Sequence, residues 1–202
     1  FREYEIDAVF YIGGNDSMDT IANLAAYGAE KGSEIRFIGV PKTIDNDLMS
    51  TDHTPGYGSA AKYIASTIKE IICDSSVYEL NSVTVVEIMG RHTGWLAGAA
   101  CLAKGADCAG PDMILLPECP FDQERFLNRV AELEKERQSL VIAVSEGVKD
   151  ASGRFLCDLV SGPGQLDAFG HKAMLSGTGR YLADLIGDKI GCKTRAVELS
   201  VL

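Results

Sequence analysis

Short apolar runs alternate along the chain with longer segments in which apolar residues recur at helical spacing. The apolar runs predict strands over residues 8–12, 35–40, 83–88, 113–116, 140–144 and 194–199. The segments with helical spacing predict helices over residues 18–31, 59–72, 95–103, 122–138 and 177–190. Because strands and helices alternate, we expect an α/β fold built on a parallel sheet with right-handed crossovers.

One segment departs from this alternation. Residues 149–175 contain several glycines, Pro163 and mixed charge but little periodicity, and we interpret them as an inserted loop or small hairpin. The runs 83–88 and 140–144, by contrast, are almost continuously apolar. That pattern is typical of strands buried on both faces of a parallel sheet.

Polar and glycine-rich residues follow the ends of several predicted strands. They occupy residues 13–17, 42–47, 90–94 and 145–147. In open α/β sheets, ligands bind beyond the carboxyl ends of the strands. We therefore expect these loops to lie along one edge of the sheet and to form a single ligand site.

The composition is that of a globular protein with an acidic surface. Of the 202 residues, 46% are hydrophobic and 24% are charged, and the formal net charge is −10. A nucleic acid or an anionic membrane surface would need a basic face, so neither is expected as a partner. No apolar run reaches the roughly 18 residues of a membrane span, and the six cysteines include no Cys-x-x-Cys pair. We expect a cytoplasmic protein with reduced cysteines.

The loop richest in chemistry is Pro41–Asp47, with the sequence Pro-Lys-Thr-Ile-Asp-Asn-Asp. Asp45 and Asp47 are two positions apart, so an extended chain would place both carboxylates on one side, where each charge raises the proton affinity of the other. Such a carboxylate suits a general base for a sugar hydroxyl, and Lys42 suits an anchor for a phosphate. The alternative is an acidic surface turn.

The other loops add groups suited to phosphate chemistry. Gly13 and Gly14 allow the backbone to approach a phosphate at the start of a helix. Asp16 suits either a Mg²⁺ ligand between phosphates or a carboxylate favoured at a helix N-terminus. Arg91 offers a fork for phosphate or sugar oxygens, and Glu146 an acceptor for sugar hydroxyls. These residues indicate phosphoryl transfer to a hydroxylated, anionic small molecule and leave the substrate open.

These motifs, in this order and at this spacing, resemble those of the 6-phosphofructokinases. The matching blocks are Gly-Gly-Asn-Asp-Ser at 13–17, Pro-x-Thr-Ile-Asp-x-Asp at 41–47, Met-Gly-Arg at 89–91 and Ser-Glu-Gly at 145–147. The resemblance spans nearly the whole chain and implies a Rossmann-like, three-layer αβα phosphofructokinase fold. It places residues 1–57 in a larger, donor-binding domain and residues 58–202 in a smaller domain that binds fructose 6-phosphate.

The resemblance also implies roles for the residues of the first loops. Asp45 is expected to deprotonate the 1-hydroxyl of fructose 6-phosphate, and Asp47 to be the second carboxylate, near the metal and the phosphoryl group. Thr43 is expected to contact the phosphoryl group or the sugar. Mg²⁺ is expected at Asp16, Asn15 and Asp47; many members carry aspartate where this chain has Asn15, which leaves more of that role to the two acids.

The same resemblance assigns the sugar-phosphate contacts. Met89, Gly90 and Arg91 are expected to hold the sugar phosphate, and Glu146 its hydroxyls. Arg195 is expected to bind the 6-phosphate, either within the chain or from a neighbouring subunit of a homodimer or homotetramer. The expected product is fructose 1,6-bisphosphate, which would place the reaction in glycolysis.

Two positions bear on the phosphoryl donor, whose phosphates Gly13 and Gly14 are expected to line. ATP-using members usually carry glycine where this chain has Asp16 and Lys42, so the pair resembles the pyrophosphate-dependent branch. Asp16 adds bulk and charge where a nucleotide α-phosphate would lie, and Lys42 supplies a cation near the shorter donor. We therefore expect pyrophosphate. The alternatives are ATP, or a non-catalytic regulatory subunit that binds sugar phosphate.

The family's pattern also bears on the two ends of the chain. Its first strand and glycine-rich phosphate loop would precede Phe1, and its Gln-Arg segment would follow Leu202. We therefore expect the chain to contain the substrate half of the site and an incomplete donor pocket.

Overall fold

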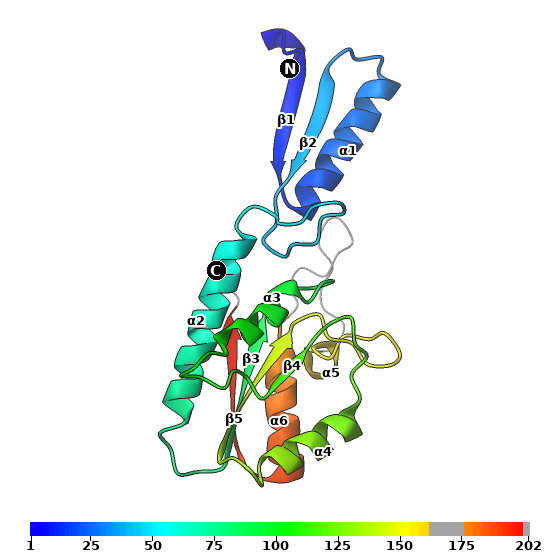
Figure 1. Cartoon of the computed structure of the whole chain (residues 1–202). Coiled ribbons are helices and arrows are strands. Elements are labelled where there is room, and N and C mark those ends of the chain that lie inside the picture. Colours follow the sequence, from blue (N-terminus) through cyan, green and yellow to red (C-terminus); the bar gives the residue numbers. More distant parts are fainter. Residues whose placement is uncertain (162–175, 200–202) are drawn as a thin grey trace.

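The computed structural model describes residues 1–161 and 176–199, and every strand ladder in its two sheets is parallel (Figure 1). One sheet is two-stranded, with the order β1-β2, and the other is four-stranded, with the order β4-β5-β3-β6. The predicted α/β class with parallel strands is confirmed. The expectation of a single sheet is wrong, because β1 and β2 pair only with each other among the described residues.

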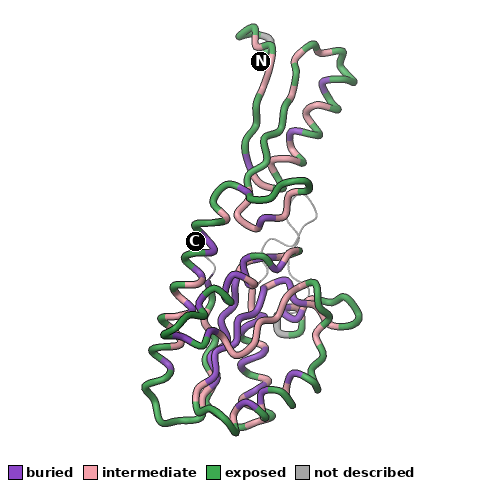
Figure 2. Tube along the Cα trace, viewed as in Figure 1, coloured by how far each residue is buried: buried purple, intermediate pink, exposed green. Residues whose placement is uncertain are grey.

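The smaller sheet forms a unit with one helix at the amino-terminal end of the chain. Strands β1 (Ala8–Gly13) and β2 (Arg36–Pro41) lie against α1 (Asn15–Glu30). A Cβ atom at Gly39 of β2 would lie 2.9 Å from Ile21 Cγ2, so this glycine lets the helix pack directly on the strand. Phe10 of β1 is 65% exposed, and most of this unit is exposed or only partly buried (Figure 2).

The larger sheet carries helices on both of its faces. Its strands are β3 (Ser82–Ile88), β4 (Met113–Leu115), β5 (Ser139–Ser145) and β6 (Lys193–Leu199). The surrounding helices are α2 (Tyr57–Ser75), α3 (Trp95–Gly98), η2 (Ala99–Ala103), α4 (Gln123–Leu133) and α6 (Thr178–Ile190), while short helices occur at η1 (Arg2–Tyr4) and α5 (Asp158–Ser161).

The larger unit has three layers because an apolar cluster on each face of the sheet packs against helices. On one face, Val85 of β3 and Ile142 of β5 pack with α4 and α6, and on the other face Val86 and Ala143 pack with α2, α3 and η2. Successive residues of a strand point to opposite faces, so a nearly continuous apolar run supplies both layers at once. The expected three-layer αβα arrangement is confirmed.

Several helix boundaries differ from those expected. The apolar segment 95–103 divides into α3 and the 3₁₀ helix η2. Helix α4 begins after Asp122, whose side chain accepts a hydrogen bond from Arg125 N, but it ends at Leu133 rather than near residue 138. After Leu133 the backbone forms a tighter turn, in which Glu136 N donates a hydrogen bond to Leu133 O at 3.0 Å. The charged residues beyond Leu133 form the turn into β5.

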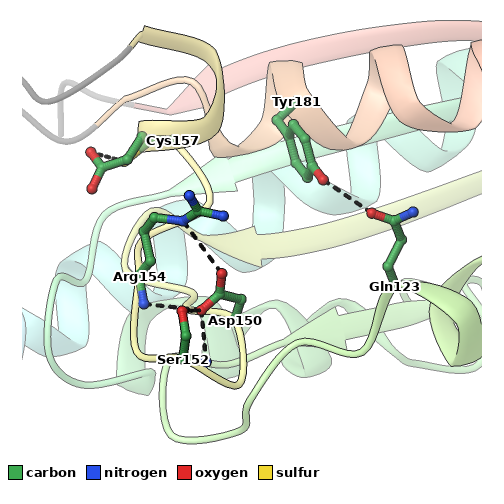
Figure 3. Close-up of polar contacts among 7 residues, drawn as sticks. Gln123, Asp150, Ser152, Arg154, Cys157 and Tyr181 are labelled. Carbon is green, nitrogen blue, oxygen red and sulfur yellow. Dashed lines mark hydrogen bonds and ion pairs between the residues drawn. The ribbon is translucent and has the colours of Figure 1, made fainter.

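The described part of the predicted inserted segment is a tight turn followed by the short helix α5. Lys149 and Phe155 form an isolated antiparallel bridge, and Asp150 accepts hydrogen bonds from Ser152 N and Arg154 N at 2.9 and 3.0 Å (Figure 3). Nearby, Tyr181 of α6 donates to the side chain of Gln123 at the start of α4. The rest of that segment, residues 162–175, lies outside the described residues.

No helix within residues 1–161 and 176–199 combines the length and the apolar character that crossing a membrane requires.

Candidate active site

Loops from both sheets line one cavity of about 600 Å³. From the smaller unit come the turn after β1 and the loop after β2, and from the larger unit come the loops after β3 and β5. The lining residues are Gly14, Asn15, Asp16, Ser17, Met18, Asp19, Asp45, Asp47, Met89, Arg91, His92 and Glu146. The predicted convergence of these loops is present, but the loops follow the carboxyl ends of two separate sheets rather than one edge of a single sheet.

The acidic loop owes its shape to Asn46. This residue is buried and has a φ of 59°, in the left-handed region, so the extended conformation expected between Asp45 and Asp47 is wrong. Its side chain accepts a hydrogen bond from Thr54 N at 2.9 Å and donates one to Asp52 O at 3.2 Å. Two bonds to the following loop thus hold Asn46 in a conformation that asparagine tolerates better than most residues.

Asp45 is a half-buried carboxyl group beside the cavity. Burial raises its pKa, and the charge of Asp47 raises it further, while Arg91 and Lys42 act in the opposite direction. Its Oδ1 atom is buried and has no hydrogen-bond partner among the described residues. Its backbone N–H donates to Thr43 Oγ1 at 3.0 Å, which ties the backbone of Asp45 to the side chain of Thr43. The expected effect of Asp47 is present but is second to burial.

The opposite wall of the cavity brings the ends of β3 and β5 together. Gly90 N donates to Glu146 Oε1 at 3.4 Å, and Ser145 Oγ donates to Gly90 O. A Cβ atom at Gly147 would overlap the backbone of Gly90 and Arg91, so only glycine allows this approach. Glu146 is thereby held beside Arg91 and Met89 at the cavity.

Glu146 is a half-buried carboxyl group with a raised pKa. Burial raises its pKa to about 7, and the charges of Asp45 and Glu87 act in the same direction, against Arg91 and the Gly90 N–H. A carboxyl group with this pKa changes its charge near neutral pH. It can therefore either donate a hydrogen bond to a ligand oxygen or accept one from a ligand hydroxyl.

The acidic side of the cavity fits a hard divalent cation. Asp47 Oδ1 is buried without a hydrogen-bond partner in the described part of the chain, and Asn15 and Asp16 line the same cavity. Oxygen ligands of this kind suit Mg²⁺, which usually keeps several waters and takes only one or two carboxylates. Residues 1–161 and 176–199 contain no group of three or more His, Cys, Asp or Glu side chains that could hold a metal ion.

Some of the predicted residues lie outside the cavity lining. Lys42 is exposed, and its backbone N–H donates to the carbonyl of buried Gly13 at 2.8 Å, joining the loops after β1 and β2. Arg195 lies near the start of β6, where its Nη1 is 3.6 Å from Asp74 Oδ2, and it does not line this cavity. Within this chain, Arg195 therefore does not reach the other candidate residues.

His92 lines the cavity although the sequence reasoning assigned it no chemical role. Burial lowers its pKa, and the charges of Lys149 and Arg91 lower it further. Its position directly after the Met-Gly-Arg block was the available signal. A neutral imidazole at this wall can both donate and accept a hydrogen bond.

A second cavity of about 850 Å³ lies along β4 and α4. Its lining contains none of the residues that the sequence pointed to, although Val148 lies only two positions beyond Glu146. Volume alone therefore does not identify the site; the convergence of the polar loops does.

The chain is similar in sequence to known proteins of one family. The family profile described as "Phosphofructokinase" matches residues 1–202. A protein of Xanthomonas campestris pv. campestris (strain B100) named "Pyrophosphate--fructose 6-phosphate 1-phosphotransferase" is 42% identical over 194 residues, which cover 95% of this chain and 46% of that protein. A protein of the same name from Methylococcus capsulatus is 40% identical over 195 residues, covering 96% and 45%.

Among solved structures, the pyrophosphate-dependent phosphofructokinase of Marinobacter aquaeolei is similar with a TM-score of 0.75 and 35% identity. The match covers 99% of this chain and 46% of that one. The chain thus spans about half the length of the curated relatives it matches.

Proposed function

Because the chain belongs to the phosphofructokinase family, we propose that the protein transfers a phosphoryl group to the 1-hydroxyl of fructose 6-phosphate, with pyrophosphate as the donor and fructose 1,6-bisphosphate as the product. The observation that carries the proposal is the half-buried carboxyl group of Asp45, whose pKa is raised, between an acidic wall and a wall with Arg91 and Glu146. A base of raised pKa with a substrate-binding arginine opposite suits proton abstraction from a sugar phosphate.

In the proposed reaction Asp45 takes the proton of the 1-hydroxyl. The hydroxyl oxygen forms a bond to one phosphorus atom of pyrophosphate while the bond from that phosphorus to the bridging oxygen breaks, and inorganic phosphate leaves. Thr43 fixes the backbone of the base through its bond to Asp45 N. Lys42 supplies positive charge for the donor, with the turn at Gly13 and Gly14 beside it.

The sugar phosphate is proposed to bind on the wall formed by β3 and β5. Arg91 holds the phosphate or sugar oxygens, Met89 and Gly90 shape the pocket, and Glu146 binds hydroxyls. Arg195 lies too far from this wall to contribute within one chain, so we assign its 6-phosphate contact to a neighbouring subunit of a homodimer or homotetramer.

Asp16, Asn15 and Asp47 are the proposed holders of Mg²⁺. When bound there, the ion would neutralise charge on the phosphoryl oxygens. Activity is then expected to be lost with a chelator and recovered with added Mg²⁺; undiminished activity in the chelator would contradict this assignment.

The domain assignment remains a proposal as well. The β1-α1-β2 unit lies within residues 1–57 and supplies the acidic, donor side of the cavity, while the four-stranded unit lies within residues 58–202 and supplies the sugar-phosphate side. The cytoplasmic location and the glycolytic role follow only from the proposed reaction.

The test is a rate measurement on the full-length protein with pyrophosphate and with ATP as donors. We expect pyrophosphate to support the faster phosphorylation of fructose 6-phosphate, in line with the names of the relatives. ATP turnover that equals or exceeds pyrophosphate turnover would contradict the assignment of pyrophosphate as the donor. Binding of fructose 6-phosphate without turnover by either donor would favour the regulatory-subunit alternative.

A further inference from the structure

Glu87 is a buried carboxyl group close to the carboxyl end of the apolar strand β3. Its side chain is 4% exposed, and its Oε2 accepts hydrogen bonds from Gly177 N at 3.2 Å and Gly179 N at 2.7 Å. These two amides belong to the first turn of α6. Burying a carboxyl group costs free energy unless the group is hydrogen-bonded, so a glutamate in a core strand indicates a specific role.

The turn formed by Gly177, Thr178 and Gly179 binds this carboxyl group through the two glycine amides. Gly177 has a φ of 104°, which residues with a side chain rarely adopt. A Cβ atom at Gly179 would lie 3.1 Å from Glu87 Cβ and 3.2 Å from Oε2, so a side chain there would push the strand and the helix apart. Both glycines therefore serve the close contact between α6 and β3.

Thr178, between the two glycines, contacts the other strand end. It is fully buried, and its hydroxyl donates a hydrogen bond of 3.1 Å to the backbone carbonyl of Glu146. The first turn of α6 is thus bonded at once to β3, two residues before Met89, and to the residue that follows β5. Met89, Arg91 and Glu146 make up the proposed sugar-phosphate wall.

We propose that Glu87 and Thr178 are positioning residues for sugar-phosphate binding, which fix the first turn of α6 against the ends of β3 and β5 and so hold Glu146 beside Arg91. This inference rests on the proposed function, since it assigns the same wall to fructose 6-phosphate. Neither side chain lines the cavity, so both act through the residues they hold.

Thr178→Val and Thr178→Ser provide a matched pair in the full-length protein. Valine keeps the shape of threonine and removes the hydroxyl, whereas serine keeps the hydroxyl. With valine, the KM for fructose 6-phosphate and its dissociation constant by calorimetry should rise about five- to tenfold, the effect of losing one positioning hydrogen bond. The kcat and the KM for pyrophosphate should change less than about twofold. Serine should restore sugar-phosphate binding to within about twofold of wild type.

Glu87→Gln and Glu87→Met form a second pair. Glutamine is nearly isosteric and keeps an oxygen that can accept the amides of Gly177 and Gly179, whereas methionine keeps the length and cannot accept them strongly. The methionine variant should weaken fructose 6-phosphate binding as Thr178→Val does, and the glutamine variant should not. If Glu87→Met does not fold, the comparison of Thr178→Val with Thr178→Ser still tests the proposal.

Thermal unfolding separates positioning from simple stability. A variant with valine at 178 that unfolds at a lower temperature but binds fructose 6-phosphate as the wild type does would overturn the proposal. Wild-type protein that binds fructose 6-phosphate without turnover would refute the proposed activity alone, and the dissociation constants of the four variants would still decide the positioning role. Wild-type protein that binds no fructose 6-phosphate would refute both.

Discussion

The hydroxyl of Thr93 donates a hydrogen bond of 3.1 Å to the backbone carbonyl of Asp45, across 48 positions of sequence. It joins the loop after β3 to the loop after β2, and therefore joins the two units that form the cavity. Since Asp45 is the proposed base and Arg91 lies two positions before Thr93, this bond joins the loop of the proposed base to the loop that carries Arg91.

Replacing Thr93 by valine should lower kcat more than it raises the KM for fructose 6-phosphate. Removing a bond that aligns the base costs about one hydrogen bond, so we expect kcat to fall about tenfold. Thr93→Ser keeps the hydroxyl and is the control. Steady-state kinetics of the two full-length variants measure the difference, and equal kcat values for valine and serine would show that the contact does not align the base.

Asp45→Asn should remove the proposed base while keeping its size. We expect kcat to fall by about 10²–10⁴, the usual contribution of a general base. Because burial disfavours the charged carboxylate, the variant should unfold at the same temperature as the wild type or a higher one at pH 8. Asp52→Asn, at an exposed acid of the same loop, is the control for the charge change. Near wild-type turnover by Asp45→Asn would rule out the base.

Glu146 should make the protein less stable as pH rises through neutrality. Its pKa is 4.5 for the ordinary group and about 7 in the folded chain, so its contribution to stability is fully present below pH 4.5 and is lost as pH rises to about 7. Glu146→Gln should therefore gain stability relative to wild type at pH 8, on the order of 1–2 kcal/mol after allowance for solvent screening.

Denaturant unfolding of wild type and Glu146→Gln at pH 4.5 and pH 8 measures this difference. The variant should also bind fructose 6-phosphate more weakly, because it loses a carboxylate acceptor. Glu79→Gln, at an exposed glutamate, is the control for the change of charge. A difference between wild type and Glu146→Gln that is the same at both pH values would contradict the shift.

Replacing both Asp16 and Lys42 by glycine should weaken the use of pyrophosphate. The change removes the cation proposed to face the donor, so kcat/KM for pyrophosphate should fall at least about tenfold, the cost of one charge-assisted contact. The same change removes the Asp16 side chain from the cavity wall beside Gly14. The larger ATP donor is expected to need that space. Donor kinetics with pyrophosphate and ATP provide the measurement, and unchanged pyrophosphate kinetics would refute the role of Lys42.

The strands, most helices and the loop chemistry could be predicted from the sequence because their signals are local. The run Val83–Ile88 is apolar at nearly every position, and Asp122 caps α4 through a residue three positions on. The polar blocks at 41–47 and 89–91 stand directly after strands, which is sufficient to predict that they face a ligand. Helix ends such as that of α4 were less predictable, since local turns compete there.

Long-range contacts decided the rest. Nothing local shows that β1 and β2 form their own sheet, that Arg195 pairs with Asp74, or that burial rather than Asp47 is the main cause of the raised pKa of Asp45. Periodicity and motifs are properties of neighbouring residues, so the elements and the chemical groups could be predicted from the sequence alone. Which groups share a wall of the cavity depends on the fold, because burial and hydrogen bonds such as Thr178 to Glu146 join residues that are distant along the chain.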